Sequence, residues 1–185
     1  LDQTPFLLLA GEGARQFALN NGCASVGDPA AHYRLPVGVE ADDLSQLDPG
    51  LVHGTIGAVA LDGNGRLAAA TSTGGLLGKQ AGRVGDTPIT GIGNWADSRV
   101  AISCTGIGES FIQAGGARDV TARMAYGGET LEQAAAGMLN AVAAKGGDGG
   151  LICLDQTGRC VMRYNSPGMK RAFARSGEAA IVAIL

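Results

Sequence analysis

The sequence has few aromatic residues, few histidines and no strong excess of charge. Only 4% of its 185 residues are aromatic, and the formal net charge is −3. Lysines and arginines are scattered, so nothing indicates a surface for nucleic acid or for a membrane. His32 and His53 are the only histidines, which are too few for a histidine-rich metal site. We therefore expect a small-molecule ligand, and no metal or other cofactor in the reaction.

Several patterns that would assign a known chemistry are also missing. The four cysteines, Cys23, Cys104, Cys153 and Cys160, form no C-x-x-C pair. Their apolar or small-residue surroundings predict buried thiols in a reducing compartment, and hence a cytoplasmic protein. A Ser-His-Asp triad has no G-x-S-x-G turn to support it. The apolar run at residues 6–10 is far too short to span a membrane.

What the chain has in abundance is glycine, with 31 residues, together with 45% hydrophobic residues. That composition suits one domain with a sizeable core and tight turns. The most informative segment is the Gly54-Thr55 pair, which opens a small-residue strand. If the bond before Thr55 is cut, its new α-amino group, with a pKa of roughly 7.7 to 8.0, can take the proton of its own hydroxyl. An ordinary strand-opening threonine is the alternative for this pair alone.

The N-terminal third gives two weaker indications. An apolar run followed by Gly-x-Gly suggests a dinucleotide site, but Gln16 stands where the third glycine should be. A short helix over residues 13–20, ended by Asn21 and Gly22, explains the segment better. Residues 24–54 contain prolines at 29, 36 and 49, and we expect them to form a mobile linker.

A hairpin is predicted after Thr55. Residues 62–65 form a turn by composition, and the strand up to Thr73 then returns antiparallel. With the turn at the centre, the hydroxyls of Thr55 and Thr73 come to the same end of neighbouring strands. Thr73 can also be an ordinary polar strand residue.

Two later segments suggest binding groups. Arg83 and Asp86 lie three residues apart between glycines; they form either a solvated ion pair or a grip on the carboxylate and ammonium of an amino acid. A buried strand then runs into a glycine-rich turn at residues 105–108, where backbone N–H groups can bind an oxyanion. Two helices, at residues 111–125 and 130–144, are expected to follow. Residues 149–155 and 159–164 should then form a hairpin, and residues 179–185 a final strand that closes the sheet.

Five motifs follow one another in the order, and nearly the spacing, found in the plant-type asparaginase/isoaspartyl peptidase family of N-terminal nucleophile hydrolases, which the chain therefore resembles. They are residues 54–62 (GTIGAVALD), 71–75 (TSTGG), 82–88 (GRVGDTP), 105–109 (TGIGE) and 149–152 (GGLI). Residues 8–14 (LLAGEGA) extend the likeness over essentially the whole chain. The resemblance implies an α+β fold, a four-layer αββα sandwich of the N-terminal nucleophile hydrolase type.

The resemblance also implies a role for each site residue. Autocatalytic cleavage between Gly54 and Thr55 would make Thr55 both nucleophile and, through its amine, base. Thr73 would hydrogen-bond to the nucleophile. The remaining roles are an oxyanion hole from Thr105 and the N–H of Gly106, a carboxylate grip from Arg83, an ammonium grip from Asp86, and a backbone contact from Gly108. The substrates would be L-asparagine or β-aspartyl dipeptides.

The same likeness implies how the chain is divided and assembled. Residues 1–54 would be the C-terminal part of an α-subunit, residues 55–185 the β-subunit, and both together one domain. The family's α-subunit also has a long N-terminal part, with a first core strand and a loop that commonly holds a structural sodium. We expect that part to be missing from the 185 residues. The family further implies a dimer of αβ heterodimers.

Two alternatives stay open. Glycosylasparaginases resemble the segment around Arg83 and Asp86 as well, but they carry an aspartate before the nucleophile, where this chain has Gly54. A non-catalytic relative of the same fold could instead bind a ligand without turning it over. Cleavage before Thr55 and release of ammonia from L-asparagine separate the enzyme from that second alternative.

Overall fold

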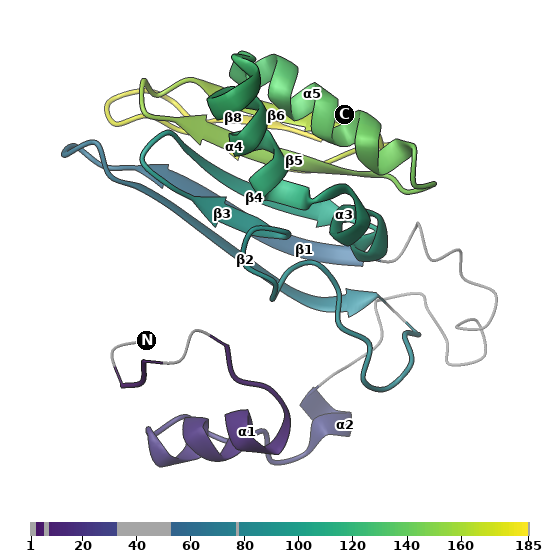
Figure 1. Ribbon diagram of the computed structural model, residues 1–185. Helices are drawn as coiled ribbons and strands as arrows, with labels where there is room; N and C mark the ends of the chain where they lie inside the picture. Colours follow the sequence, from purple (N-terminus) through teal and green to yellow (C-terminus); the bar gives the residue numbers. More distant parts are fainter. Residues whose placement is uncertain (1–2, 6–7, 33–52, 77, 185) are drawn as a thin grey trace. The chain divides into compact units, whose positions relative to one another are not determined.

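The computed structural model describes residues 3–5, 8–32, 53–76 and 78–184, in two compact units that span Leu1–Asp43 and Leu44–Leu185 (Figure 1). Most of the predicted linker, at residues 33–52, lies outside the described residues, as do residues 6 and 7 of the first apolar run. The predicted division into subunits after Gly54 is not tested by this partition.

The N-terminal unit contains helix α1 (Gly11–Asn20) and the single helical turn α2 (Pro29–His32). The predicted helix over residues 13–20 is therefore confirmed, and it begins two residues earlier. It ends where expected, because Asn21 bonds back to the last turn and Gly22 has a φ of 81°, a conformation that glycine adopts without strain.

The larger unit opens with a β-hairpin made of β1 (His53–Leu61) and β2 (Leu67–Leu76). Its turn is held by Asp62, whose carboxylate accepts the backbone N–H groups of Asn64 and Arg66 at 2.9 and 2.8 Å. Gly65, with a φ of 79°, completes the reversal. The hairpin predicted around residues 62–65 is confirmed.

A four-stranded antiparallel sheet forms the centre of this unit. Its order is β3 (Asn94–Ala96), β4 (Val100–Gly106), β5 (Gly149–Asp155) and β6 (Cys160–Tyr164). Nearly every residue of β4 is buried, so the buried strand predicted before the glycine-rich turn is confirmed. The hairpin predicted between residues 149–155 and 159–164 is confirmed as β5 and β6.

Three helices follow β4 instead of the expected two: α3 (Gly108–Ala114), α4 (Gly116–Gly127) and α5 (Leu131–Ala143). The helix expected over residues 111–125 breaks because Gly115 and Gly116 have φ values of 86° and 50°. A Cβ on Gly116 would lie 2.4 Å from the Ile92 carbonyl oxygen, so the close approach at the break requires glycine. Thr130 and Gln133 form a capping box at the start of α5.

These elements stack in three layers (Figure 1). The β1–β2 hairpin packs on one face of the four-stranded sheet, and the helices cover the other face. The hydrophobic core lies between the sheet and the helices, and it includes Ile102, Phe111, Val120, Met138 and Leu151. The outer face of the hairpin is open, with Ile56 79% exposed. Helix and sheet are thus mixed as an α+β fold requires.

The last strand is a correction to the sequence prediction. Residues 179–185 were expected to close the main sheet, but β8 (Ile181–Ala183) pairs with β7 (Arg171–Phe173) in a separate two-stranded sheet. The chain leaves the main sheet after Tyr164 through a loop that contains Pro167 and Gly168. β7 follows that loop outside the main sheet, and β8 pairs with it antiparallel, with Arg171 opposite Ala183 and Phe173 opposite Ile181.

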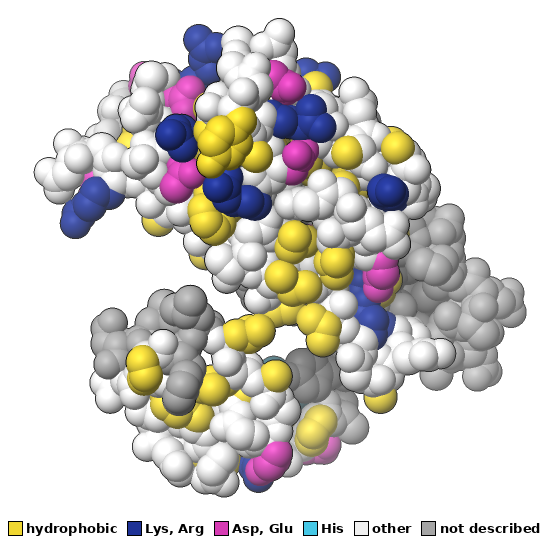
Figure 2. Space-filling model, viewed as in Figure 1, with side chains coloured by type: hydrophobic (Ala, Val, Ile, Leu, Met, Phe, Trp, Pro, Cys, Tyr) yellow, Lys and Arg dark blue, Asp and Glu magenta, His cyan; other side chains and the backbone are white. Residues whose placement is uncertain are grey.

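Charged side chains of both signs lie on the surface of the larger unit (Figure 2). On the face shown in Figure 2, Lys and Arg side chains alternate with Asp and Glu over the helical layer, without a field of one sign. A nucleic-acid surface would need clustered positive charge. Among the described residues, no helix has the length and apolar character needed to cross a bilayer.

Candidate active site

The hairpin brings Thr55 and Thr73 together as predicted. The two residues are paired across β1 and β2, and their side-chain oxygens lie 3.4 Å apart. Side chains alternate between the two faces of a strand. Thr55 and Thr73 are both half-buried and lie on the face of the hairpin that packs against the four-stranded sheet. The sequence-based geometric prediction for this pair is therefore confirmed.

The Thr73 hydroxyl is the most connected group of the pair. Its Oγ1 donates to the Gly54 carbonyl oxygen at 3.0 Å and accepts the Gly75 N–H at 3.0 Å and the Thr55 hydroxyl at 3.4 Å. It therefore touches both the predicted nucleophile and the carbonyl of the peptide bond predicted to be cut. A hydrogen bond of this kind polarises that carbonyl toward attack.

The hairpin is irregular at this position. His53 pairs with Leu76 and Thr55 with Thr73, so two steps on β1 face three on β2. Gly75 in the wider segment has a φ of 82°, which suits glycine. Bulges of this type are common next to active sites, where they re-aim a side chain.

A tight contact between layers fixes the hairpin beneath these threonines. Thr71 Oγ1 lies 2.7 Å from Ser103 Oγ and donates to the Gly93 carbonyl at 3.2 Å. A Cβ on Gly57 would lie 2.1 Å from Ser103 Oγ. Only glycine at position 57 lets β1 approach β4 this closely, which sets the height of Thr55 above the sheet.

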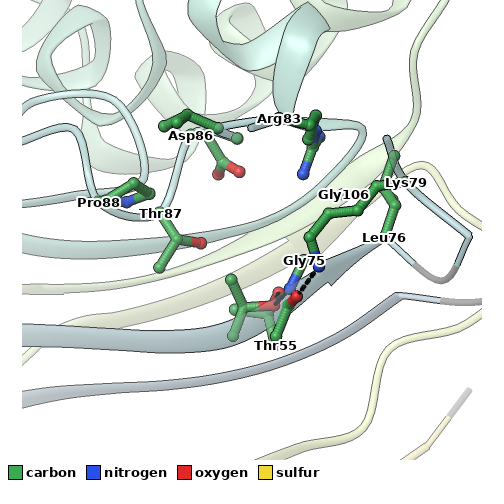
Figure 3. Close-up of a pocket in the computed structure, with 13 residues that line it drawn as sticks. Thr55, Gly75, Leu76, Lys79, Arg83, Asp86, Thr87, Pro88 and Gly106 are labelled. Carbon is green, nitrogen blue, oxygen red and sulfur yellow. Dashed lines mark hydrogen bonds between the residues drawn. The ribbon is translucent and has the colours of Figure 1, made fainter. Parts of the chain in front are cut away.

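Arg83 and Asp86 share a cavity with the threonine pair. The cavity has a volume of about 180 Å³, and its lining includes Thr55, Thr73, Arg83, Asp86 and Gly106. Figure 3 shows Arg83 and Asp86 pointing into the space that Thr55 faces. Drug-sized ligands occupy roughly 300–1,000 Å³, so this volume suits a molecule of amino-acid size.

Asp86 is the most unusual charged group in the cavity. Its residue is only 6% exposed, and burial raises the pKa of its carboxyl although the N–H groups of Asp86 and Thr87 and the charge of Arg83 oppose that shift. Oδ2 makes no hydrogen bond to any described residue. A buried carboxylate without a partner is unfavourable, so this oxygen is suited to receive a cationic group of a ligand.

Glycines 106 and 108 lie in close contacts where a side chain would collide with its neighbours. Gly106 has a φ of 143°, and a Cβ there would lie 2.3 Å from the Asp148 carbonyl oxygen. A Cβ on Gly108 would lie 2.9 Å from Asp86 Oδ1. Both positions therefore require glycine, and Gly108 lies against Asp86. The backbone contact of Gly108 with a substrate stays a prediction.

Thr105 is placed differently from the other site residues. It lines a second cavity of about 540 Å³ that also contains Gly54, Thr55 and Met169. Thr55 borders both cavities, so its hydroxyl stands between the charged pair on one side and a larger space on the other. The roles predicted for Thr105 and Gly106 in an oxyanion hole stay predictions.

Two residues near the site received no role from the sequence. Lys79 lines the first cavity, and its amino group donates to the Gly74 carbonyl (Figure 3). Glu109 binds Arg83. Their positions in the sequence gave a weak indication that they lie near the site, because Glu109 ends the 105–109 motif and Lys79 precedes Arg83 by four residues. Neither spacing defines a contact without the fold.

The cysteine prediction is correct only in part. Cys104 and Cys153 are buried free thiols, and burial raises the pKa of both. Cys23 is exposed and Cys160 is half-buried, so the expectation of four buried thiols is wrong. Cys23 follows the turn at the end of α1, and Cys160 opens β6 after the turn at residues 156–157. Within the described ranges, no three His, Cys, Asp or Glu side chains are grouped to hold a metal ion.

Comparison with known proteins shows which family the chain resembles. The family model described as asparaginase matches residues 1–184. The chain belongs to the asparaginase family. It is 41% identical over 191 residues to "Isoaspartyl peptidase" of Salmonella typhimurium, covering 96% of this chain and 61% of that protein. It is 38% identical over 185 residues to "Isoaspartyl peptidase/L-asparaginase" of Bos taurus, covering 96% and 60%.

A plant member of the asparaginase family is similar as well. "Probable isoaspartyl peptidase/L-asparaginase 2" of Arabidopsis thaliana is 39% identical over 153 residues, which are 83% of this chain and 43% of the plant protein. The resemblance to this family is therefore confirmed. The chain spans about three-fifths of the length of the Salmonella and Bos relatives that it matches.

Proposed function

We propose that the protein containing this chain is an autoprocessing amidohydrolase, which cleaves L-asparagine, β-aspartyl dipeptides or both through a covalent ester of Thr55. The observation that carries the proposal is the shared cavity. A threonine pair, hydrogen-bonded to the carbonyl before Thr55, borders the same space as a cation and an anion suited to an amino acid. The names of its relatives support the same chemistry.

Maturation begins at the Gly54–Thr55 bond. Thr55 Oγ attacks the Gly54 carbonyl carbon while Thr73 donates to the carbonyl oxygen, and the C–N bond breaks to leave an ester and a free Thr55 amine. Water then hydrolyses the ester, which releases the Gly54 carboxylate and restores the Thr55 hydroxyl. The 3.0 Å bond from Thr73 to the Gly54 oxygen supports this step.

Turnover repeats the chemistry on the substrate. The Thr55 amine takes the hydroxyl proton, Oγ attacks the side-chain carbonyl, and the resulting oxyanion is bound by Thr105 and the Gly106 N–H. The amine returns the proton to the leaving nitrogen, so ammonia or an amino acid departs. Water then hydrolyses the β-aspartyl ester and releases aspartate, with the same amine as base.

Substrate orientation comes from the charged pair. Arg83 binds the α-carboxylate with its guanidinium, Asp86 binds the α-ammonium, and the Gly108 backbone carbonyl adds a contact. The unpartnered Oδ2 of Asp86 supports its role. Both proposed substrates present the same two groups, so the pair accepts either one.

The proposal extends to the assembly. The exposed apolar outer face of the hairpin, with Ile56 79% exposed, supports a fourth, helical layer over it, as in an αββα sandwich. Cleavage would separate residues 1–54 from residues 55–185 as α- and β-subunits, in a cytoplasmic dimer of αβ heterodimers. Size-exclusion chromatography with light scattering on the full-length protein measures that stoichiometry.

Hydrolysis by the purified full-length protein tests the function. Ammonia release from L-asparagine and leucine release from β-aspartyl-leucine are measured for the natural protein, for Thr55→Ala and for Ser72→Ala. Ser72 is an exposed hydroxyl residue on the same hairpin, so its variant is the matched control. We expect activity in the natural and Ser72→Ala proteins and none in Thr55→Ala. Activity in Thr55→Ala, or cleavage of neither substrate by the natural protein, contradicts the proposal.

A further inference from the structure

The Arg83 guanidinium already has an anionic partner. Arg83 Nε and Nη2 donate to the two carboxylate oxygens of Glu109, each at 2.8 Å. The Arg83 side chain is 16% exposed and that of Glu109 is 50% exposed. A bidentate pair with one partner mostly buried holds the guanidinium plane in one orientation. It also ties the loop before β3 to the first turn of α3.

Among the described residues, Glu109 alone hydrogen-bonds to the Arg83 guanidinium. Arginine has five N–H donors, and the two used here come from Nε and Nη2. Arg83 lines the first cavity, whereas Glu109 is absent from the residues that line it. Glu109 therefore lies behind Arg83, and both N–H groups of Nη1 and one of Nη2 remain for a carboxylate in the cavity.

Asp86 offers Arg83 a competing partner. The two residues interact electrostatically, yet no ion pair joins them among the described residues. Asp86 Oδ2 is buried without a hydrogen-bond partner in the part of the chain that the structure describes, and a nearby cation would relieve that unfavourable state. If Arg83 were released, pairing with Asp86 would neutralise both groups that grip the substrate.

We propose that Glu109 is a positioning residue, which holds Arg83 away from Asp86 so that the site keeps a separate carboxylate grip and ammonium grip. The inference rests on the proposed function, because it assigns Glu109 a task in the same substrate site. Glu109 itself does not touch the substrate. It acts through the orientation of Arg83, so its removal weakens binding and leaves the chemistry at Thr55 intact.

The glycines around the guanidinium agree with a fixed position. A Cβ on Gly85 would lie 2.7 Å from Arg83 Nη1, and one on Gly108 would lie 3.0 Å from Nη2. The pair is also charged throughout the neutral range, because the hydrogen bond raises the pKa of Arg83 and lowers that of Glu109. Both charges of the pair therefore support the fixed position of Arg83 at neutral pH.

Steady-state kinetics on the full-length protein tests the inference. Glu109→Ala removes both acceptors, and Glu109→Gln keeps the length and one acceptor. The matched control is Glu132→Gln, which removes a similarly exposed carboxylate from a 3.4 Å pair with Arg159 on the helical layer. For L-asparagine we expect Glu109→Ala to raise KM ~10- to 100-fold, Glu109→Gln to raise it less, and the control to match the natural protein. We expect kcat to change by less than about threefold.

A double-mutant cycle separates positioning from a direct or general structural effect. In an Arg83→Met background, Glu109→Ala should change KM for L-asparagine no further, because Glu109 acts only through Arg83. Equal effects of Glu109→Ala in both backgrounds would overturn the inference. An unchanged KM in Glu109→Ala, or a loss confined to kcat, would overturn it as well.

A crystal structure of the Glu109→Ala protein gives a readout that does not depend on turnover. We expect the Arg83 guanidinium within ~4 Å of the Asp86 carboxylate, and an unchanged Arg83 orientation would contradict the inference. If Glu109→Ala does not fold, the same measurement on Glu109→Leu, which fills similar space but has no acceptor for Arg83, is decisive. Failure of the natural protein to hydrolyse either substrate would reject the proposed function, while the Arg83 position still decides the role of Glu109.

Discussion

Replacing Thr73 with valine should strongly slow cleavage of the Gly54–Thr55 bond and lower the stability of the fold only modestly. Valine keeps the shape of the side chain but loses the hydroxyl that joins the Gly54 oxygen, the Gly75 N–H and Thr55. A donor aimed at a reacting carbonyl oxygen is worth ~10²- to 10³-fold in rate. We therefore expect Thr73→Val to cleave itself ~10²- to 10³-fold more slowly than the natural protein.

The effect on stability should be modest. Thr73 is half-buried, and the Gly75 N–H loses its acceptor, which costs ~1–3 kcal/mol if the group stays unpaired. For a chain of this size, that loss lowers Tm by ~2–4 °C per kcal/mol. Differential scanning calorimetry measures the change on the full-length protein.

The assay follows cleavage over time by intact-mass spectrometry of freshly purified full-length protein. Thr71→Val is the matched control, because Thr71 lies on the same face of the same strand and its hydroxyl bonds Ser103 and Gly93 instead of the cleavage site. We expect the control to lose stability without the loss in cleavage rate. If Thr73→Val and Thr71→Val cleave at the same rate, the assigned role of the Thr73 hydroxyl is wrong.

Three further changes test the supports of the site. Asp86→Asn should abolish binding of L-aspartate in calorimetry and raise Tm at pH 7. Because burial raises the pKa of Asp86, its ionised form destabilises the fold above that pKa, so the gain in Tm should disappear as the pH falls and Asp86 becomes protonated; a gain that grows at low pH would contradict this sign. Gly57→Ala places a Cβ 2.1 Å from Ser103 Oγ and should lower the free energy of unfolding by ~1–3 kcal/mol in urea titration; an unchanged midpoint would refute the contact. Phe111→Ala empties a fully buried position and should cost ~3–5 kcal/mol in the same titration, whereas a loss below 1 kcal/mol would show that the core is not packed as described.

Local sequence signals predicted the hairpin and its consequence. The turn at residues 62–65 has the glycine and asparagine that such reversals require, and equal strand lengths on both sides then placed Thr55 opposite Thr73. Helix α1 could also be predicted from the sequence, because Asn21 and Gly22 form its C-terminal end. These features depend on neighbours within about 20 residues, which a single sequence displays.

Features that depend on distant contacts were missed. The break between α3 and α4 is associated with the close approach of Gly116 to Ile92. A glycine in the sequence does not by itself indicate which residue it will contact. The partner of β8 depends on where the chain leaves the main sheet after Tyr164. The pairing of Arg83 with Glu109 joins residues 26 positions apart, and spacing instead suggested Asp86 as the nearest anion.

The most direct test of the central claim is the mass and N-terminal sequence of the fragments in purified full-length protein. We expect two fragments whose masses sum to the intact chain plus one water, the second of which begins at Thr55. A single chain with an intact Gly54–Thr55 bond that still releases ammonia from L-asparagine would contradict the claim that Thr55 becomes an N-terminal nucleophile.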